Sequence, residues 1–281
     1  MEISVIITTY NWPEALALSL KSVLAQKQLP LEVIVADDGS TSETAEMIRS
    51  IAANAPIPVI HSWQEDKGFR LARSRNRAIA RARGEYVILI DGDIIAERHF
   101  VHDHHRFARK GFFVQGTRVL LTKQLSQQIL RTGELSANCC SAGVGNRKNC
   151  LRSDLLANIF SFKSRRLPGI KTCNFAFWRQ DAIRVNGFNE DFVGWGREDS
   201  EFTVRLMNIG LRRQNVKFNA LAYHLYHSKS DRRHLSDNDK ILKHSIQKKL
   251  SWCENGLEQH LLSTQRKVHD CGVNRTGEPG R

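Results

Sequence analysis

An unbroken apolar run that ends on two carboxylates constrains the fold of this chain more than any other stretch. All side chains of Val87–Ile90 are apolar, as in strands buried on both faces of a sheet, and Asp91 and Asp93 follow closely. Two acids at the end of a buried strand are costly unless a cation or another group offsets them. If the chain stays extended through Gly92, both carboxylates point to one side. Two hard oxygen ligands placed in that way suit a divalent cation that carries phosphate oxygens.

The Asp91-Gly92 dipeptide is also typical of a turn that opens a loop, so its surroundings must separate the two interpretations. Strand-like and helical patterns alternate in the first half of the chain. The expected strands are Ile3–Thr8, Leu31–Ala36, Val59–Ile60 and Tyr86–Ile90, and the expected helices are 13–26, 41 to beyond 48, and 71–83. This alternation predicts an α/β fold with a parallel sheet, whose ligands bind at the carboxyl ends of the strands.

Polar side chains follow three of these strands. Thr8 and Tyr10 follow the first, Asp38 follows the second, and Asp91 and Asp93 follow the central one. Polar groups at the ends of three neighbouring strands converge on one edge of the sheet, which is harder to explain by turn chemistry than a single pair. The sequence therefore predicts a site at this edge.

Basic residues recur along the helix that precedes the central strand. Arg70, Arg73 and Arg77 lie on one helical face, with Arg75 and Asn76 beside it. Arginines near a helix N-terminus can hold a diphosphate. The alternative is a basic face exposed to solvent.

The second half begins near residue 112 and has weaker patterns. The expected strands are Phe112–Leu121, Thr172–Trp178 and Lys217–Tyr226, and the expected helices are 181–185, 198–208 and 236–257. Segment 123–171 shows no sustained period and carries nine Lys or Arg against two acids. It is interpreted as a region that covers the substrate or as an irregular insertion. Residues 263–281 lack any period and are expected to be disordered.

Two further groups in this half have side chains suited to chemistry. Trp195 lies between glycines, and Glu198 and Asp199 open the expected helix. Carboxylates in a first helical turn are favoured by the helix dipole alone, but a carboxylate beside an aromatic platform can also serve as a general base. His224 and His227 lie at the end of a strand, where one of them could complete a metal site begun by Asp93.

The net charge of +13 favours anionic partners, which include nucleic acid, anionic lipid and phosphorylated substrates. No apolar run reaches the length of a membrane span, which predicts a cytoplasmic protein. The basic segment 123–171 and the amphipathic helix 236–257 allow peripheral contact with an anionic membrane at its inner face.

A basic nucleic-acid-binding protein is the alternative from another class, although the chain carries no nucleic-acid-binding motif. A nucleotidyltransferase would need a glycine-rich loop after the first strand, and Thr8–Asn11 is not one.

Taken together, the motifs resemble those of family 2 glycosyltransferases with the GT-A fold. The motifs of the nucleotide-sugar half are Ser4–Asn11, Asp37–Ser40, Gly68–Asn76 and Asp91–Asp93, in this order. The segment Gly194–Asp199 resembles the acceptor motif of galactosyltransferase and N-acetylgalactosaminyltransferase types, including bacterial capsule polymerases. Arg197 departs from this pattern, because these families often have a small residue there.

This resemblance implies a single Rossmann-like domain at 1–235 with a mixed, mainly parallel sheet. Residues 1–110 would form its nucleotide-binding half and 111–235 its acceptor-binding half, followed by an amphipathic helix at 236–262 and the tail 263–281. It also implies a metal-dependent inverting glycosyltransferase that uses Mn²⁺ or Mg²⁺ and does not bind nucleic acid. The enzyme would move galactose or an N-acetylhexosamine from a UDP-sugar to a saccharide or lipid-linked acceptor in cell-surface polysaccharide or lipopolysaccharide synthesis.

The resemblance also implies a role for each matching residue. The uridine would be held by Thr8, Tyr10 and Asp38, and the nucleotide-diphosphate side would be lined by Asp66, Arg75 and Asn76. Asp91 would reach the ribose, and Asp93 would bind the metal together with His224 or His227. Trp195 and Glu198 would hold the acceptor, and Asp199 would be the catalytic base.

Overall fold

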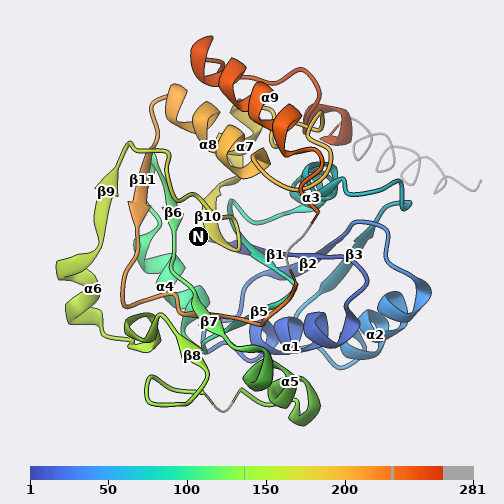
Figure 1. Ribbon diagram of the computed structural model, residues 1–281, viewed down its shortest axis with the longest axis vertical. Coiled ribbons are helices and arrows are strands. Elements are labelled where there is room, and N and C mark those ends of the chain that lie inside the picture. Colours follow the sequence, from blue (N-terminus) through green and yellow to red (C-terminus); the bar gives the residue numbers. More distant parts are fainter. Residues whose placement is uncertain (136, 229–230, 262–281) are drawn as a thin grey trace, which may run out of the picture.

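A computed structural model describes residues 1–135, 137–228 and 231–261, and its described part contains one large central sheet (Figure 1). The strand order is β3-β2-β1-β4-β10-β6-β11-β9. Neighbouring strands of the first four run parallel, β10 is antiparallel to β4 and β6, and β9 is antiparallel to β11. Their bounds are β1 Ile3–Thr9, β2 Glu32–Asp37, β3 Val59–Trp63, β4 Tyr86–Asp91, β6 Phe112–Gln115, β9 Phe162–Ser164, β10 Asn174–Trp178 and β11 Arg212–Asn215. The expected mixed, mainly parallel sheet is confirmed.

Helices cover both faces of this sheet because the central strands are apolar on both sides. Ile88 of β4 packs in the same core as α1 and α2, whereas its neighbour Leu89 packs in the core formed with α3 and α8. Both side chains are fully buried. The helices are α1 Pro13–Leu24, α2 Ser42–Ala52, α3 Leu71–Arg81, α4 Phe100–Phe107, α5 Lys123–Thr132, α6 Asp154–Phe160, α7 Arg179–Arg184, α8 Glu198–Asn208 and α9 Leu235–Gln247.

A smaller sheet lies at the carboxyl ends of the central strands. Its order is β5-β12-β7-β8, with bounds β5 Ile94–Ala96, β7 Val119–Leu121, β8 Val144–Gly145 and β12 Ala222–His224. β5 leaves β4 through a short turn, and β12 pairs with β5 so that His224 lies opposite Ile94. This pairing brings His224 next to the end of the central strand.

Two strands expected in the second half are wrong in their bounds. The stretch 112–121 contains β6 and β7, which belong to different sheets. β6 ends at Gln115, and the next residue is Gly116, where a Cβ would lie 2.2 Å from the Asn174 side chain. The stretch 217–226 contains only β12, because β11 ends at Asn215 before it.

The helix expected at 236–257 ends ten residues earlier, at Gln247. Lys249 has a φ of 50°, in the left-handed region that a continuing helix cannot use.

Segment 123–171 holds regular elements that the sequence did not reveal, namely α5, β8, α6 and β9. The tail expected to be disordered, 263–281, lies outside the described residues. Within the described ranges, no helix combines the length and apolar character needed to cross a membrane.

Candidate active site

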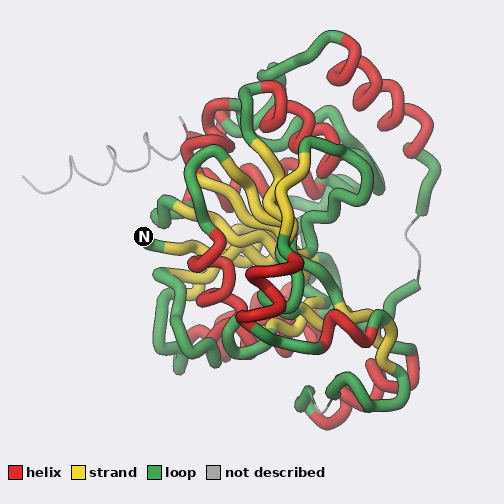
Figure 2. The backbone as a smooth tube through the Cα atoms, turned by 90° about the vertical axis from the view of Figure 1, so that its left-hand side faces the viewer, coloured by secondary structure: helices red, strands yellow, loops and turns green. Residues whose placement is uncertain are grey.

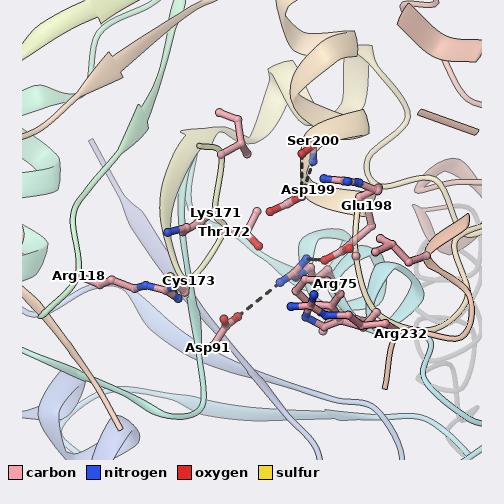
Figure 3. Close-up of a pocket in the computed structure, with 16 residues that line it drawn as sticks. Arg75, Asp91, Arg118, Lys171, Thr172, Cys173, Glu198, Asp199, Ser200 and Arg232 are labelled. Atoms are coloured by element: carbon pink, nitrogen blue, oxygen red, sulfur yellow. Dashed lines mark hydrogen bonds and ion pairs between the residues drawn. The ribbon is translucent and has the colours of Figure 1, made fainter. Parts of the chain in front are cut away.

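Two connected cavities lie at the carboxyl ends of β1, β2 and β4. The strand-end cavity, of about 650 Å³, is lined by residues that include Thr8, Tyr10, Asp38, Asp93, His224 and His227. The Asp199 cavity, of about 440 Å³, is lined by residues that include Arg75, Glu198, Asp199 and Ser200. Both are lined by Leu71, Asp91, Arg118, Trp195 and Arg232, so they form one continuous groove. Figure 3 shows the lining of the Asp199 cavity. The expected convergence of polar strand ends is therefore present.

The two acids after the central strand are separated by a turn. β4 ends on Asp91, and Gly92 and Asp93 form the turn before β5, so the expectation of extended chain through Gly92 is wrong. The Gly92 amide donates to the Thr8 carbonyl at 2.7 Å, and a Cβ at this position would lie 2.7 Å from that oxygen. Only glycine allows this close approach. The stretch is thus a turn that also carries the two acids of the site, so the two interpretations of the sequence do not exclude each other.

Asp93 faces two histidines. His224 Nε2 lies 3.6 Å and His227 Nε2 lies 3.4 Å from Asp93 Oδ2, and ligand atoms of the three residues all lie within 4.8 Å of one another. Burial and the charge of Asp91 raise the pKa of Asp93 to about 8, and Asp93 Oδ1 is buried without a hydrogen-bond partner among the described residues. Burial and Arg118 lower the pKa of His224 to about 4, which keeps its imidazole neutral. The partnerless Asp93 oxygen, the neutral His224 imidazole and the nearby His227 ring nitrogen form a donor set that fits a divalent cation.

Arg75 links the two cavities. Its side chain is 2% exposed, and its Nη1 donates to Glu198 Oε1 at 3.1 Å while its Nη2 lies 3.5 Å from Asp91 Oδ1 (Figure 3). Thr8 Oγ1 donates to the same Asp91 oxygen at 3.0 Å. The guanidinium expected along the diphosphate is therefore shared between two carboxylates of the groove.

Asp199 and Glu198 open α8 at the far side of the groove. Asp199 Oδ1 accepts hydrogen bonds from the Ser200 amide at 2.6 Å and from Ser200 Oγ at 3.2 Å. Burial and the charge of Glu198 raise the pKa of Asp199 to about 7. A carboxyl group that titrates near neutral pH is suited to accept a proton. Glu198 Oε2 is buried without a partner in the described part of the chain, which leaves an acceptor for a bound hydroxyl.

The segment before α8 has an unusual backbone. Arg197 has a φ of 79°, in the region that favours glycine, which agrees with its place where a small residue was expected. Its Nε donates to Asp239 Oδ1 of α9 at 2.6 Å, and this contact holds the segment. The neighbouring Trp195 is 39% exposed, and the Arg232 guanidinium lies 5.0 Å from its ring centroid. The partly exposed Trp195 ring lines both cavities, with Arg232 beside it.

Asp38 and Tyr10 occupy the opposite end of the groove. Asp38 Oδ1 accepts from Gln64 Nε2 at 2.6 Å, Oδ2 accepts from the Arg70 amide at 2.7 Å, and burial raises its pKa to about 6. Tyr10 Oη donates to Asp66 Oδ2 at 2.9 Å. Asp66 does not line the described cavities but orients Tyr10, which does. Gln64 was not expected, because nothing in the sequence marks its contact with Asp38.

Asn76 is a correction to the expected site. Its Nδ2 donates to the Phe188 carbonyl at 2.7 Å and to Glu190 Oε1 at 2.8 Å, and its Oδ1 accepts from the Phe188 amide at 2.8 Å. It is fully buried and lines none of the described cavities. Its amide holds α3 against the chain between α7 and α8. Its role is therefore structural.

The basic face of α3 is also structural in part. Arg70 and Arg77 donate to backbone carbonyls of the loop and strand that precede the helix, at Glu65 and Trp63. Neither residue lines a described cavity. The face thus fastens α3 to β3.

A third cavity, called the basic cavity, adjoins the Asp199 cavity. It has a volume of about 210 Å³ and shares Arg118, Lys171 and Cys173 with its neighbour. Lys217 also lines it, and no acidic side chain of the described residues does. Burial, Lys148 and Arg213 lower the pKa of Lys217. This crowding of cations favours an anionic ligand. The sequence showed the charge of this region but not its gathering around a cavity.

Two family models match the chain. Residues 4–138 match "Glycosyl transferase family 2", and residues 157–228 match "N-terminal domain of galactosyltransferase". A chondroitin synthase of Escherichia coli is 29% identical over 238 residues, which cover 79% of this chain and 34% of that protein. The chain therefore spans about a third of the length of this relative.

Solved structures with the same fold confirm the GT-A architecture. S. aureus TarS 1-349 in complex with UDP has a TM-score of 0.55 and 19% identity, covering 96% of this chain and 72% of that chain. The mannosyltransferase PcManGT from Pyrobaculum calidifontis, in complex with GDP-Man and Mn²⁺, has a TM-score of 0.55 and 16% identity, covering 98% and 76%.

Proposed function

We propose that this chain, a glycosyltransferase whose residues 4–138 belong to family 2, moves a sugar from a UDP-sugar to a saccharide or lipid-linked acceptor with inversion. The observation that carries the proposal is one groove with the Asp93–histidine group at one end and Asp199 at the other. The donor sugar is galactose or an N-acetylhexosamine, and the product belongs to a cell-surface polysaccharide or lipopolysaccharide. The enzyme works in the cytoplasm.

The strand-end cavity is the proposed donor site. Thr8, Tyr10 and Asp38 line it, which supports their assignment to the uridine, and Asp91 lies between it and the Asp199 cavity. Asp93, His224 and His227 would hold Mn²⁺ or Mg²⁺, which when bound neutralises the charge of the diphosphate as a Lewis acid. Arg118 lines all the described cavities of the groove and adds a fixed positive charge.

Asp199 is the proposed base. Its carboxylate takes the proton of an acceptor hydroxyl, whose oxygen forms the new bond to the anomeric carbon. The bond between that carbon and the UDP oxygen breaks, and UDP leaves with the electron pair. Glu198 and Trp195 orient the acceptor, the first by a hydrogen bond and the second by contact with the sugar face.

The proposed domain boundaries are the ones that the family resemblance implies. Residues 1–235 form the transferase domain, with 1–110 as its donor half and 111–235 as its acceptor half. The pairing of β10 with β4 joins the two halves in one sheet, which supports a single transferase domain. α9 packs on α8 and forms part of the cover of the acceptor half.

The donor assignment is tested by measuring UDP release from a panel of UDP-sugars. We expect release from UDP-galactose or a UDP-N-acetylhexosamine in Mn²⁺, and its loss in EDTA with recovery on adding metal. GDP-mannose serves as the control for the nucleotide. Equal release in EDTA and in Mn²⁺ would contradict the metal-dependent mechanism, and preference for GDP-mannose would contradict the UDP assignment.

The basic cavity leads to a prediction on the acceptor. We expect an oligosaccharide that ends in a uronic acid to stimulate UDP release about tenfold more than the matched neutral one, since about 1.4 kcal/mol of added attraction gives a factor of ten. Lys217→Ala should remove most of this preference and leave UDP release with the neutral oligosaccharide unchanged. Lys243→Ala, on α9, is the matched control. Equal stimulation by both oligosaccharides would refute an anionic acceptor.

A further inference from the structure

A surface outside the groove carries an unusual concentration of exposed apolar side chains. Leu155, Ile159, Phe160 and Phe162 are 69, 62, 53 and 51% exposed, and Leu151 is 46% exposed. Soluble proteins scatter such residues singly, and a contiguous group marks an interaction surface. We call these side chains, together with the adjacent Lys163, Arg165 and Arg166, the α6–β9 ridge. The elements that carry it, α6 and β9, lie at the left margin of Figure 1, on the side that faces the viewer in Figure 2.

The contacts of α6 explain why its apolar side chains point outward. Ala157 is buried, and Arg106 of α4 donates to Asp154 Oδ1 at 2.8 Å and to Asn158 Oδ1 at 2.6 Å. These contacts fix one face of the helix to the protein. Leu155 and Ile159 are four residues apart and therefore lie together on another face. That face has nothing to pack against within the described chain, as their exposure shows.

The charge beside this face is positive. Segment 151–171 has five Lys or Arg and one acid, Asp154, which is already paired with Arg106 and Arg152. Lys163, Arg165 and Arg166 are exposed, and none of them pairs with a carboxylate in the described part of the chain. Lys163 Nζ lies 5.0 Å from the Phe112 ring centroid, but no carboxylate of the described residues neutralises any of the three cations. An apolar face flanked by such cations matches the interface of a bilayer with anionic head groups.

A second copy of the chain fits this surface less well. β9 is an edge strand, so pairing between copies is open to it. A two-fold contact through the ridge would bring Lys163, Arg165 and Arg166 of the two copies together, and like charges oppose such a contact. An anionic membrane has the complementary charge.

We propose that the α6–β9 ridge inserts into the interfacial region of an anionic membrane. The ridge also adjoins the basic cavity, because Lys217 N donates to Ser161 Oγ at 3.1 Å and Asn215 Nδ2 donates to the Phe162 carbonyl at 3.3 Å. Membrane contact through the ridge would place this cavity close to lipid head groups. The idea that the membrane supplies the cavity with a lipid-linked acceptor rests on the proposed function. The membrane contact itself is independent of that function.

The amphipathic helix near the C-terminus is the competing surface, and its contacts favour the ridge. α9 packs against α8, with Ser245 Oγ donating to Glu201 Oε1 at 3.0 Å and Asp239 accepting from Arg197. Its apolar side is thereby used for internal packing. Among the described residues of α9, Ile246 is the one large apolar side chain that is exposed, at 46%, and it provides a matched control.

Vesicle cosedimentation tests the proposal. Wild-type protein should bind vesicles of phosphatidylglycerol and phosphatidylcholine at least tenfold more tightly than vesicles of phosphatidylcholine alone, and added salt should weaken this binding. Leu155→Glu with Ile159→Glu should reduce binding to the anionic vesicles at least tenfold. Ile246→Glu should leave it unchanged. Unchanged binding by the ridge variant, or its loss in the Ile246 variant, would overturn the proposal.

Two measurements distinguish membrane contact from self-association and from a defect in the groove. Sedimentation velocity without lipid should give the same monomer mass for wild type and ridge variant, and a wild-type dimer that the variant loses would show that a second copy covers the ridge. UDP release without acceptor should be equal in both proteins, because the ridge does not line the groove. If neither the wild type nor the ridge variant released UDP, the proposed function would be refuted. The result of the vesicle-binding experiment would not be affected.

Discussion

Replacing Asp199 with asparagine is expected to abolish most sugar transfer while UDP binding stays close to that of the wild type. The amide keeps the shape of the side chain but cannot accept the acceptor proton as a carboxylate does. General-base catalysis contributes about 10²–10⁴-fold, so the rate should fall by that factor. Asp199 lies in the cavity opposite the Asp93–histidine group, so the donor site is untouched.

The measurement is the rate of UDP release with acceptor, together with UDP binding by calorimetry. Asp237→Asn, an exposed acid on α9, is the control for a general loss of carboxylate charge. Because the pKa of Asp199 is raised to about 7, the proposed base is deprotonated above that pH, and the wild-type rate should rise as pH increases through 7. Glu198→Gln removes a like charge and should move this rise to lower pH. Wild-type transfer by the Asp199 variant would show that another group is the base.

The second large effect is expected for Asp93→Ala. Residues that only hydrogen-bond to metal ligands change affinity or activity by about 10–100-fold, so loss of a direct carboxylate ligand should cost about a hundredfold or more. Mn²⁺ binding, measured by calorimetry in the presence of UDP, should weaken along with transfer. Asp237→Ala removes an exposed acid on α9, away from the groove, and should retain metal binding.

Stability in EDTA separates this effect from misfolding. Asp93 Oδ1 is buried without a hydrogen-bond partner among the residues that the structure describes, so the variant should unfold at the same temperature as the wild type or higher when no metal is bound. A variant that unfolds earlier in EDTA would point to a structural role for Asp93. Wild-type affinity for Mn²⁺ in the folded variant would exclude Asp93 as a ligand.

The sequence predicts the donor half well because its strands depend on local patterns. Val87–Ile90 is apolar throughout, and such a run can only be buried on both faces. The acceptor half depends on contacts distant in sequence. β6 ends at Gln115, and the next residue, Gly116, lies so close to the Asn174 side chain that a Cβ would not fit. No local pattern carries that information.

The residues of the candidate site divide in the same way, into those that local patterns predict and those that depend on contacts distant in sequence. Asp91, Asp93 and Asp199 could be predicted from their places at a strand end and a helix start. Arg118 could not, because the bend between β6 and β7 brings it to the groove. Asn76 was assigned wrongly because its motif gives the position along α3 but not the Phe188 backbone that its amide binds.

Arg75 has a consequence for how relatives of this chain can diverge. Its buried guanidinium is shared between Asp91, at the end of β4, and Glu198, at the start of α8. Removing one partner of a buried ion pair costs about 3–5 kcal/mol, a large part of the stability of a typical domain. A lineage that neutralises Glu198 to accept a different sugar therefore gains from replacing Arg75 as well, which in turn alters the surroundings of Asp91. Positions 75, 91 and 198 should consequently evolve as a unit, and new acceptor preferences should arise by their joint substitution.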